Sequence, residues 1–194
     1  IPLPDQGRHA LVASRDTTDL INIPETTSTS NTELETREVY LAESGPGRVV
    51  ETTEATGSIA RNHRDEFQRV EEQAFREDLE NYARSSYKSK SIGAAKLSDV
   101  SDLAVPFRLE MEALQCSIAK TERTDAAVSV NAWNLLLRLR ETLDYNHDDP
   151  PAKPRQSDLY FYEPHRVTWR WVVTPALGYA TAKLPENSEI QMGK

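Results

Sequence analysis

The segment from residue 166 to 171 alternates strictly between polar and large apolar side chains, and Val173 continues the apolar positions. The apolar residues at every second position are Val167, Trp169, Trp171 and Val173. Because successive side chains of a β-strand point to opposite faces, this spacing predicts a strand that presents all four on one face. Such an aromatic face either fills the core of a β-sheet protein or forms a platform on which a ligand stacks.

The same period-two alternation recurs along the chain and predicts a fold rich in short strands. It is clearest where Phe107, Leu109 and Met111 alternate with charged residues. The turn-forming residues 43–47 predict a β-hairpin between strands at 34–42 and 48–56. Further extended segments are predicted at residues 9–14, 19–23, 90–97, 126–130, 135–139, 158–162 and 179–183.

One long amphipathic helix is predicted over about residues 61–86, where apolar side chains recur at helical spacing. The arc consists of Phe67, Val70, Ala74, Phe75, Leu79 and Tyr82. Many short strands around one helix are typical of an α+β, mainly β fold. We therefore expect an antiparallel β-sandwich-like sheet or sheets, with the helix covering one edge or face.

The domain organisation follows from the distribution of apolar residues. Residues 1–31 are rich in Pro, Thr, Ser and Asp and poor in large apolar side chains, which predicts an extended N-terminal arm. Residues 32–194 are expected to form a single β-rich domain with one helix. The opening Ile1-Pro2-Leu3-Pro4 looks like the middle of a longer protein.

Charge and hydropathy disfavour two classes of partner. The formal net charge of -8 provides no excess of Lys and Arg to displace the counterions of nucleic acid, so no nucleic-acid partner is expected. No apolar run reaches the roughly 18 residues that a membrane-spanning helix needs, so no span is expected in this chain. No motif indicates a cofactor or an oligomeric state.

Catalytic and metal-binding residues are not expected. Cys116 is the single thiol, and its surroundings have no nucleophile-turn motif, which favours a structural role. The four histidines lack metal-ligand spacing, although His147 with Asp148 and Asp149 could contact a cation in a loop. An enzyme built from carboxylates with His147 or His165 is a weaker alternative. The 31 acidic residues allow many carboxylate pairs and single out none.

Five stretches, in their order along the chain, resemble bacterial transglutaminase-like proteins in the region after the catalytic core. They are residues 7–12, 36–39, 49–57, 102–109, and the run from Trp171 through Pro175, Gly178 and Tyr179 to Leu184-Pro185. In that family, the core is flanked by uncharacterised β-rich domains. The resemblance implies an accessory C-terminal domain that packs on an upstream transglutaminase-like core of the same polypeptide or binds a partner. It also implies a periplasmic, cell-surface or secreted location.

The same resemblance transfers no catalytic residue. The family's nucleophile lies in a Gly-Asp-Cys-Lys-Asp context, whereas Cys116 lies in Leu114-Gln115-Cys116-Ser117. We therefore expect the chain not to be an enzyme. The alternative function is a carbohydrate- or peptide-binding β-sandwich module that uses Trp169 and Trp171 as its ligand-binding residues, although the alternation favours a core role for both.

Overall fold

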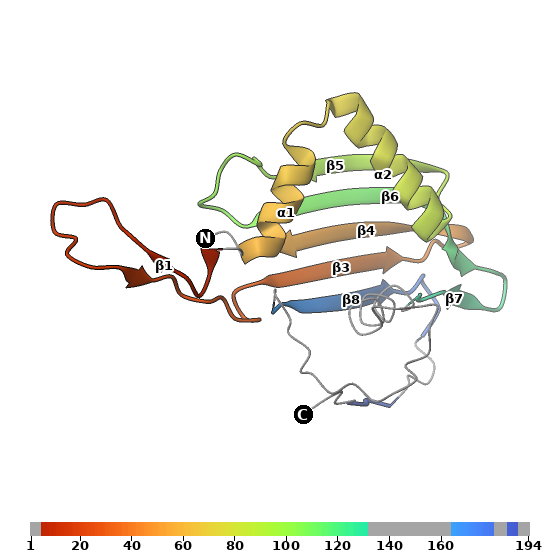
Figure 1. The fold of residues 1–194 in the computed structure, drawn as a ribbon. Coiled ribbons are helices and arrows are strands. Elements are labelled where there is room, and N and C mark those ends of the chain that lie inside the picture. The colour runs from red at the N-terminus through yellow and green to blue at the C-terminus, as the bar shows by residue number, and fades with distance from the viewer. Residues whose placement is uncertain (1–4, 132–163, 181–185, 190–194) are drawn as a thin grey trace, which may run out of the picture.

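The computed structural model describes residues 5–131, 164–180 and 186–189. Its main sheet consists of β3 (Thr32–Tyr40), β4 (Gly45–Ala55), β5 (Ser91–Leu97), β6 (Phe107–Thr121), β7 (Ala126–Val128) and β8 (Arg166–Thr174). The strand order is β5-β6-β4-β3-β8, and β7 pairs with β6. The helices α1 (Gly57–Phe67) and α2 (Glu72–Tyr87) lie on one face of this sheet (Figure 1). The expected α+β, mainly β class is confirmed.

The strand directions differ from the sequence expectation at one edge of the sheet. β3 and β4 form the predicted antiparallel hairpin, with Arg37 opposite Glu51. However, β8 pairs with β3 in parallel, with Trp169 opposite Glu35. The sheet is therefore mixed, because the long connection between β7 and β8 returns the chain to an edge where a short hairpin could not place it.

The expected sandwich is not confirmed, because the described residues form one main sheet covered by helices. The outer face of this sheet is half-exposed and carries ion pairs such as Arg48 with Glu112, 2.7 Å apart, and Lys96 with Glu110, 3.4 Å apart. Period-two alternation shows only that one face of each strand is buried. A pair of helices can cover that face as well as a second sheet can.

The single helix predicted over residues 61–86 is in fact two helices, with a break between Phe67 and Glu72. The rings of Phe67 and Phe75 meet edge to face, with centroids 5.5 Å apart. In a continuous helix these two positions would be separated by about 12 Å along the axis. The break turns the chain so that both rings approach the sheet, where Phe67 also stacks on Phe107.

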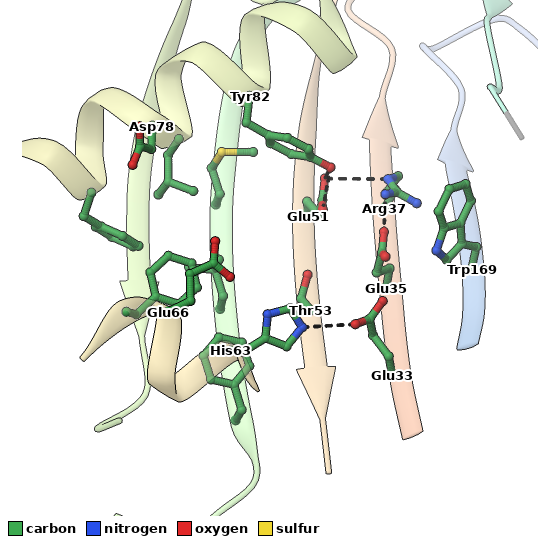
Figure 2. Close-up of a pocket in the computed structure, with 16 residues that line it drawn as sticks. Glu33, Glu35, Arg37, Glu51, Thr53, His63, Glu66, Asp78, Tyr82 and Trp169 are labelled. Carbon is green, nitrogen blue, oxygen red and sulfur yellow. Dashed lines mark hydrogen bonds and ion pairs between the residues drawn. The ribbon is translucent and has the colours of Figure 1, made fainter. Parts of the chain in front are cut away.

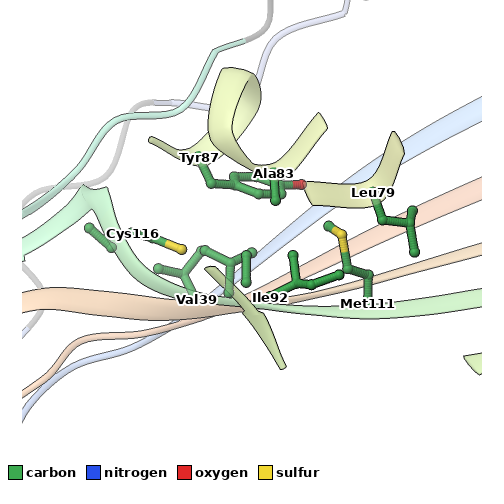
Figure 3. Close-up of a cluster of buried hydrophobic side chains, with 10 residues drawn as sticks. Val39, Leu79, Ala83, Tyr87, Ile92, Met111 and Cys116 are labelled. Carbon is green, nitrogen blue, oxygen red and sulfur yellow. The ribbon is translucent and has the colours of Figure 1, made fainter. Parts of the chain in front are cut away.

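Two apolar clusters hold the helices against the sheet. The larger one includes Val39, Val49, Leu79, Ala83, Tyr87, Ile92, Met111 and Cys116 (Figure 3). The smaller one contains Ala55, Ala60 and Phe107. Because Val39 and Val49 lie near one end of the β3–β4 pair and Ala55 near the other, the two clusters bracket the middle of the sheet's inner face.

The N-terminal residues form a small separate hairpin, β1 (His9–Ala10) with β2 (Ile21–Asn22), which projects away from the main sheet (Figure 1). Buried Asn31 connects this part to α1, because its Oδ1 accepts a hydrogen bond from the Ser58 backbone N–H at 3.0 Å. Gly57 has a φ of +63°, and a Cβ there would collide with Asn31 Oδ1. The predicted segments at 135–139 and 158–162, most of 179–183, and His147 lie outside the described residues.

Candidate ligand-binding site

The inner face of β3 carries three charged side chains between the two apolar clusters. Glu33, Glu35 and Arg37 occupy successive inward positions, and Glu51 of β4 lies beside Arg37 (Figure 2). The Arg37 side chain is 7% exposed and that of Glu51 is 9% exposed. Burial removes these charges from water, so their interactions with one another determine their ionisation.

Arg37 lies at the centre of the cluster. Its Nη2 forms an ion pair with Glu35, its Nε lies 3.6 Å from Glu51 Oε2, and Nε donates a hydrogen bond to Tyr87 Oη at 2.9 Å. The guanidinium carbon lies 4.7 Å from the ring centroid of Trp169 and 5.3 Å from that of Trp171. Burial opposes the charged form, but the Glu51 carboxylate together with Tyr82 and Glu35 more than offsets this and raises the pKa of Arg37. Arg37 is therefore a permanent cation.

Glu51 is held by two tyrosines of α2. Tyr82 donates a hydrogen bond to the Glu51 carboxylate, 3.0 Å from each oxygen, and Tyr87 donates to Oε2. Burial raises the pKa of Glu51 from 4.5 to about 7, although the Arg37 charge and the Tyr82 hydrogen bond oppose this. Burial, followed by the hydrogen bond with Glu33, likewise raises the pKa of Glu35. Two buried carboxyl groups thus share one guanidinium, with the Glu33 carboxyl group beside them, and the cluster retains a proton near neutral pH.

α1 completes the cluster through His63. Its Nε2 lies 3.0 Å from Glu33 Oε2, and its ring stacks on Phe107 with centroids 4.8 Å apart. The stacking fixes the direction in which the imidazole points, and the first turns of α1 place it over the end of β3. Glu33 is therefore held between the sheet and α1.

The cluster lines a cavity of about 580 Å³ between the sheet and the helices. Opposite the charged residues is an apolar wall formed by Phe67, Phe75, Leu79, Phe107, Leu109 and Met111. The exposed lining residues Glu66, Asp78 and Tyr82 all belong to the helices, so the cavity opens to solvent on the helix side (Figure 2). The volume lies within the range of small-molecule sites in proteins.

Two residues that line this cavity each carry a buried donor that lacks an acceptor among the residues that the structure describes. The donors are Arg37 Nη1 and the indole Nε1 of Trp169. A buried N–H without a partner costs roughly 1–3 kcal/mol. Both residues neighbour Glu35: Arg37 forms an ion pair with its carboxyl group through Nη2, and Trp169 lies opposite it in the β3–β8 register. The site therefore offers hydrogen-bond donors and acceptors side by side.

The two tryptophans singled out by the sequence occupy different positions relative to this site. Trp169 lines both the 580 Å³ cavity and a neighbouring pocket, whereas Trp171 lines only the neighbouring pocket, together with Tyr87. Both rings are half-buried and pack on Arg37, so each combines features of the core and platform interpretations. Their role in ligand binding stays a prediction.

The charged cluster itself was missed by the sequence analysis. Glu33, Glu35 and Arg37 read as the solvent face of their strand, because charged side chains are rarely buried. The available signal was in β4, where Glu51 shares its parity with Val49 and Ala55.

Cys116 lies in the larger apolar cluster and is fully buried. Burial raises the pKa of its thiol to about 11, so the thiol stays protonated at neutral pH. Within the described ranges, no three His, Cys, Asp or Glu side chains are grouped to hold a metal ion. Neither helix of the described chain has the length and apolar composition needed to cross a membrane.

Comparisons with known proteins identify no relative of this chain, so the functional argument rests on the pocket. No family model, no curated protein and no solved structure matches the chain.

Proposed function

We propose that this domain is a non-catalytic binding module that takes a small polar ligand in the cavity between the sheet and the helices. The observation that carries the proposal is the pair of buried, unpartnered donors, Arg37 Nη1 and Trp169 Nε1, on two residues that line a cavity of about 580 Å³. A core that served packing alone would be more stable with apolar residues at these positions. An oxygen of a bound ligand would satisfy both donors.

Binding is favoured over catalysis by the way in which the most perturbed carboxyl group is held. A general acid must be free to transfer its proton to a ligand. Both oxygens of Glu51 already accept hydrogen bonds from Tyr82, and Oε2 accepts a further one from Tyr87. The buried cluster thus resembles a preorganised recognition surface rather than an acid–base pair.

The test uses a Trp169→Phe variant, which removes the Nε1 donor and retains an aromatic ring. A panel of amino acids, dipeptides and disaccharides is screened by thermal shift, and the affinity of any compound that binds is then measured. We expect at least one compound to raise the Tm, and Trp169→Phe to weaken its binding by about 5- to 150-fold. Trp171→Phe is the matched control and should change the affinity little, because Trp171 does not line this cavity.

The opposite outcome has two parts. If no compound of the panel raises the Tm, and Trp169→Phe is more stable than the wild type, the unpartnered donor is a packing defect and the proposal fails. Binding that is lost in Trp171→Phe but kept in Trp169→Phe would move the site to the neighbouring pocket and also contradict the proposal.

A second function concerns the protein as a whole: an accessory domain of a larger transglutaminase-like envelope protein, docked on the catalytic core of the same polypeptide. The arm favours this role, because Leu11, Val12, Leu20 and Ile21 are each at least 46% exposed on or beside its hairpin. Apolar side chains gathered on a projecting segment are typical of a docking surface. Hydrogen exchange of residues 8–23 should slow when the chain is extended upstream. Equal exchange in the short and extended chains would exclude docking of the arm.

A further inference from the structure

We propose that the cavity recognises the α-ammonium group and the adjacent carbonyl oxygen of an amino acid, or of the first residue of a peptide, with an apolar side chain. This rests on the proposed binding function and specifies its ligand.

The charge balance of the site favours a cationic group. Three carboxyl groups, from Glu33, Glu35 and Glu51, face a single guanidinium in the buried cluster, and His63 is the one other basic side chain among the cavity-lining residues. The exposed lining residues Glu66 and Asp78 add two further carboxylates at the entrance. An ammonium group would compensate the excess negative charge, which a neutral ligand cannot do.

The positions of the donors favour an oxygen next to that ammonium. Arg37 Nη1 and Trp169 Nε1 are both without an acceptor, and both residues lie beside Glu35. In an amino acid, the α-nitrogen and the carbonyl oxygen are separated by roughly 3 Å. A ligand with its ammonium on Glu35 would therefore place its carbonyl oxygen near the two donors, and one carbonyl oxygen accepts two hydrogen bonds.

The remainder of the cavity determines which side chain and what size of ligand it can accommodate. The wall opposite the charged residues is built from aromatic and aliphatic side chains of both helices and β6, which suits an apolar side chain. A cavity of about 580 Å³ is larger than one amino acid needs. The first two residues of a peptide would fill more of it, which makes a peptide the better source.

Binding should release a proton, because an ammonium beside the cluster favours its ionised carboxylates. The titratable and charged groups that face the cluster are Glu33, Glu35 and Arg37 from β3, Glu51 from β4, His63 and Glu66 from α1, and Asp78, Tyr82 and Tyr87 from α2. The carboxyl groups of Glu35 and Glu51 are the proton donors, since burial raises the pKa of both.

The experiment is titration calorimetry of the full chain at pH 7 with four probes: L-leucyl-L-leucine, its N-acetyl derivative, free L-leucine and maltose. Each is measured in phosphate and in Tris, whose heats of protonation differ. We expect the dipeptide to bind with a buffer-dependent heat that reports proton release, and acetylation to weaken it by about 100-fold. Maltose should not bind. Tighter binding of the dipeptide than of L-leucine identifies a peptide as the source, and equal affinity identifies the free amino acid.

Two variants assign the recognition to particular residues. Glu35→Gln should lower the affinity for the dipeptide by at least 10-fold and reduce the proton release on binding. Asp78→Asn changes an exposed residue at the cavity entrance, so the fold should stay intact. We expect this variant to lower the affinity for the dipeptide by about 2- to 5-fold.

The outcomes separate this inference from the function on which it rests. If the acetylated dipeptide binds as tightly as the free one, or if maltose binds and the dipeptide does not, the ammonium assignment is wrong while the binding function stands. If none of the four probes binds and the broader panel also raises no Tm, both proposals fail.

Discussion

The inner face of the sheet has an apolar region and a charged region, and the same two strands, β3 and β4, contribute to both. At one end of β3 and β4, Val39 and Val49 pack against α2 in an apolar cluster. Two and four residues away on β3, Arg37 and Glu35 are also buried but charged. The first region stabilises the fold by removing apolar surface from water, whereas the second contributes little net stability because desolvation offsets its ion pairs. Because the charged cluster adds little stability, its position beside an apolar core is an argument that it binds a ligand.

The largest expected effect comes from removing the central cation of the charged region. Arg37→Met leaves the carboxyl groups of Glu35 and Glu51 without their ion-pair partner in a buried site. We expect the free energy of unfolding to fall by about 3–5 kcal/mol at pH 8. At pH 5 the loss should be smaller, because protonated carboxyl groups need no counter-charge. Urea denaturation at both pH values measures the difference.

Two controls distinguish a charge effect from a packing effect. Ile92→Ala in the apolar region should cost about 2–5 kcal/mol by leaving a cavity, equally at pH 5 and pH 8. Arg108→Met removes an arginine of the outer face that is 48% exposed, and it should cost less than about 1 kcal/mol. If the loss in Arg37→Met is independent of pH, the guanidinium acts by packing and the contrast between the two regions disappears.

The strands and their alternation could be predicted from the sequence because local pattern determines them. Every strand of the main sheet overlaps a predicted extended segment, although β6 continues to Thr121, well beyond the predicted alternation at residues 107–113. The break between α1 and α2 could not be predicted, since residues 68–71 contain neither glycine nor proline. Contacts distant in sequence, such as those of Phe67 with Phe107, favour the break. The parallel pairing of β8 also depends on a distant partner, which no single segment reveals.

The candidate site was predicted only in part, for a related reason. Trp169 stood out by its size and parity, but the charged residues opposite it did not. On β3, each face carries apolar side chains, Leu34 and Tyr40 on one and Val39 on the other, and the structure buries the face with Val39, Glu35 and Arg37. Which face of a strand is buried depends on the helices above it and on the strands beside it. Burial of a charge depends further on partners such as Tyr82 and Tyr87.

A smaller effect tests the ionisation of the charged region. The pKa of Glu51 is about 7 in the folded protein and near 4.5 in the unfolded chain, so the folded state binds the proton more tightly. Its contribution to stability is therefore complete below pH 4.5 and is lost as the pH rises through 7, a difference of roughly 3 kcal/mol. Glu51→Gln removes this titration, and its stability relative to the wild type should improve between pH 5 and pH 8.

The matched control for this variant is Glu112→Gln on the outer face of the same sheet. The hydrogen bond from Arg48 lowers the pKa of Glu112, so this group stays ionised throughout the range from pH 5 to pH 8. Its replacement should shift the stability equally at both pH values. Glu35 retains its own raised pKa in Glu51→Gln, so a shallower slope in the same direction should remain. Parallel stability curves for the wild type and Glu51→Gln would mean that Glu51 is ionised throughout, and the charged region would then be a satisfied ion-pair network with no proton to release.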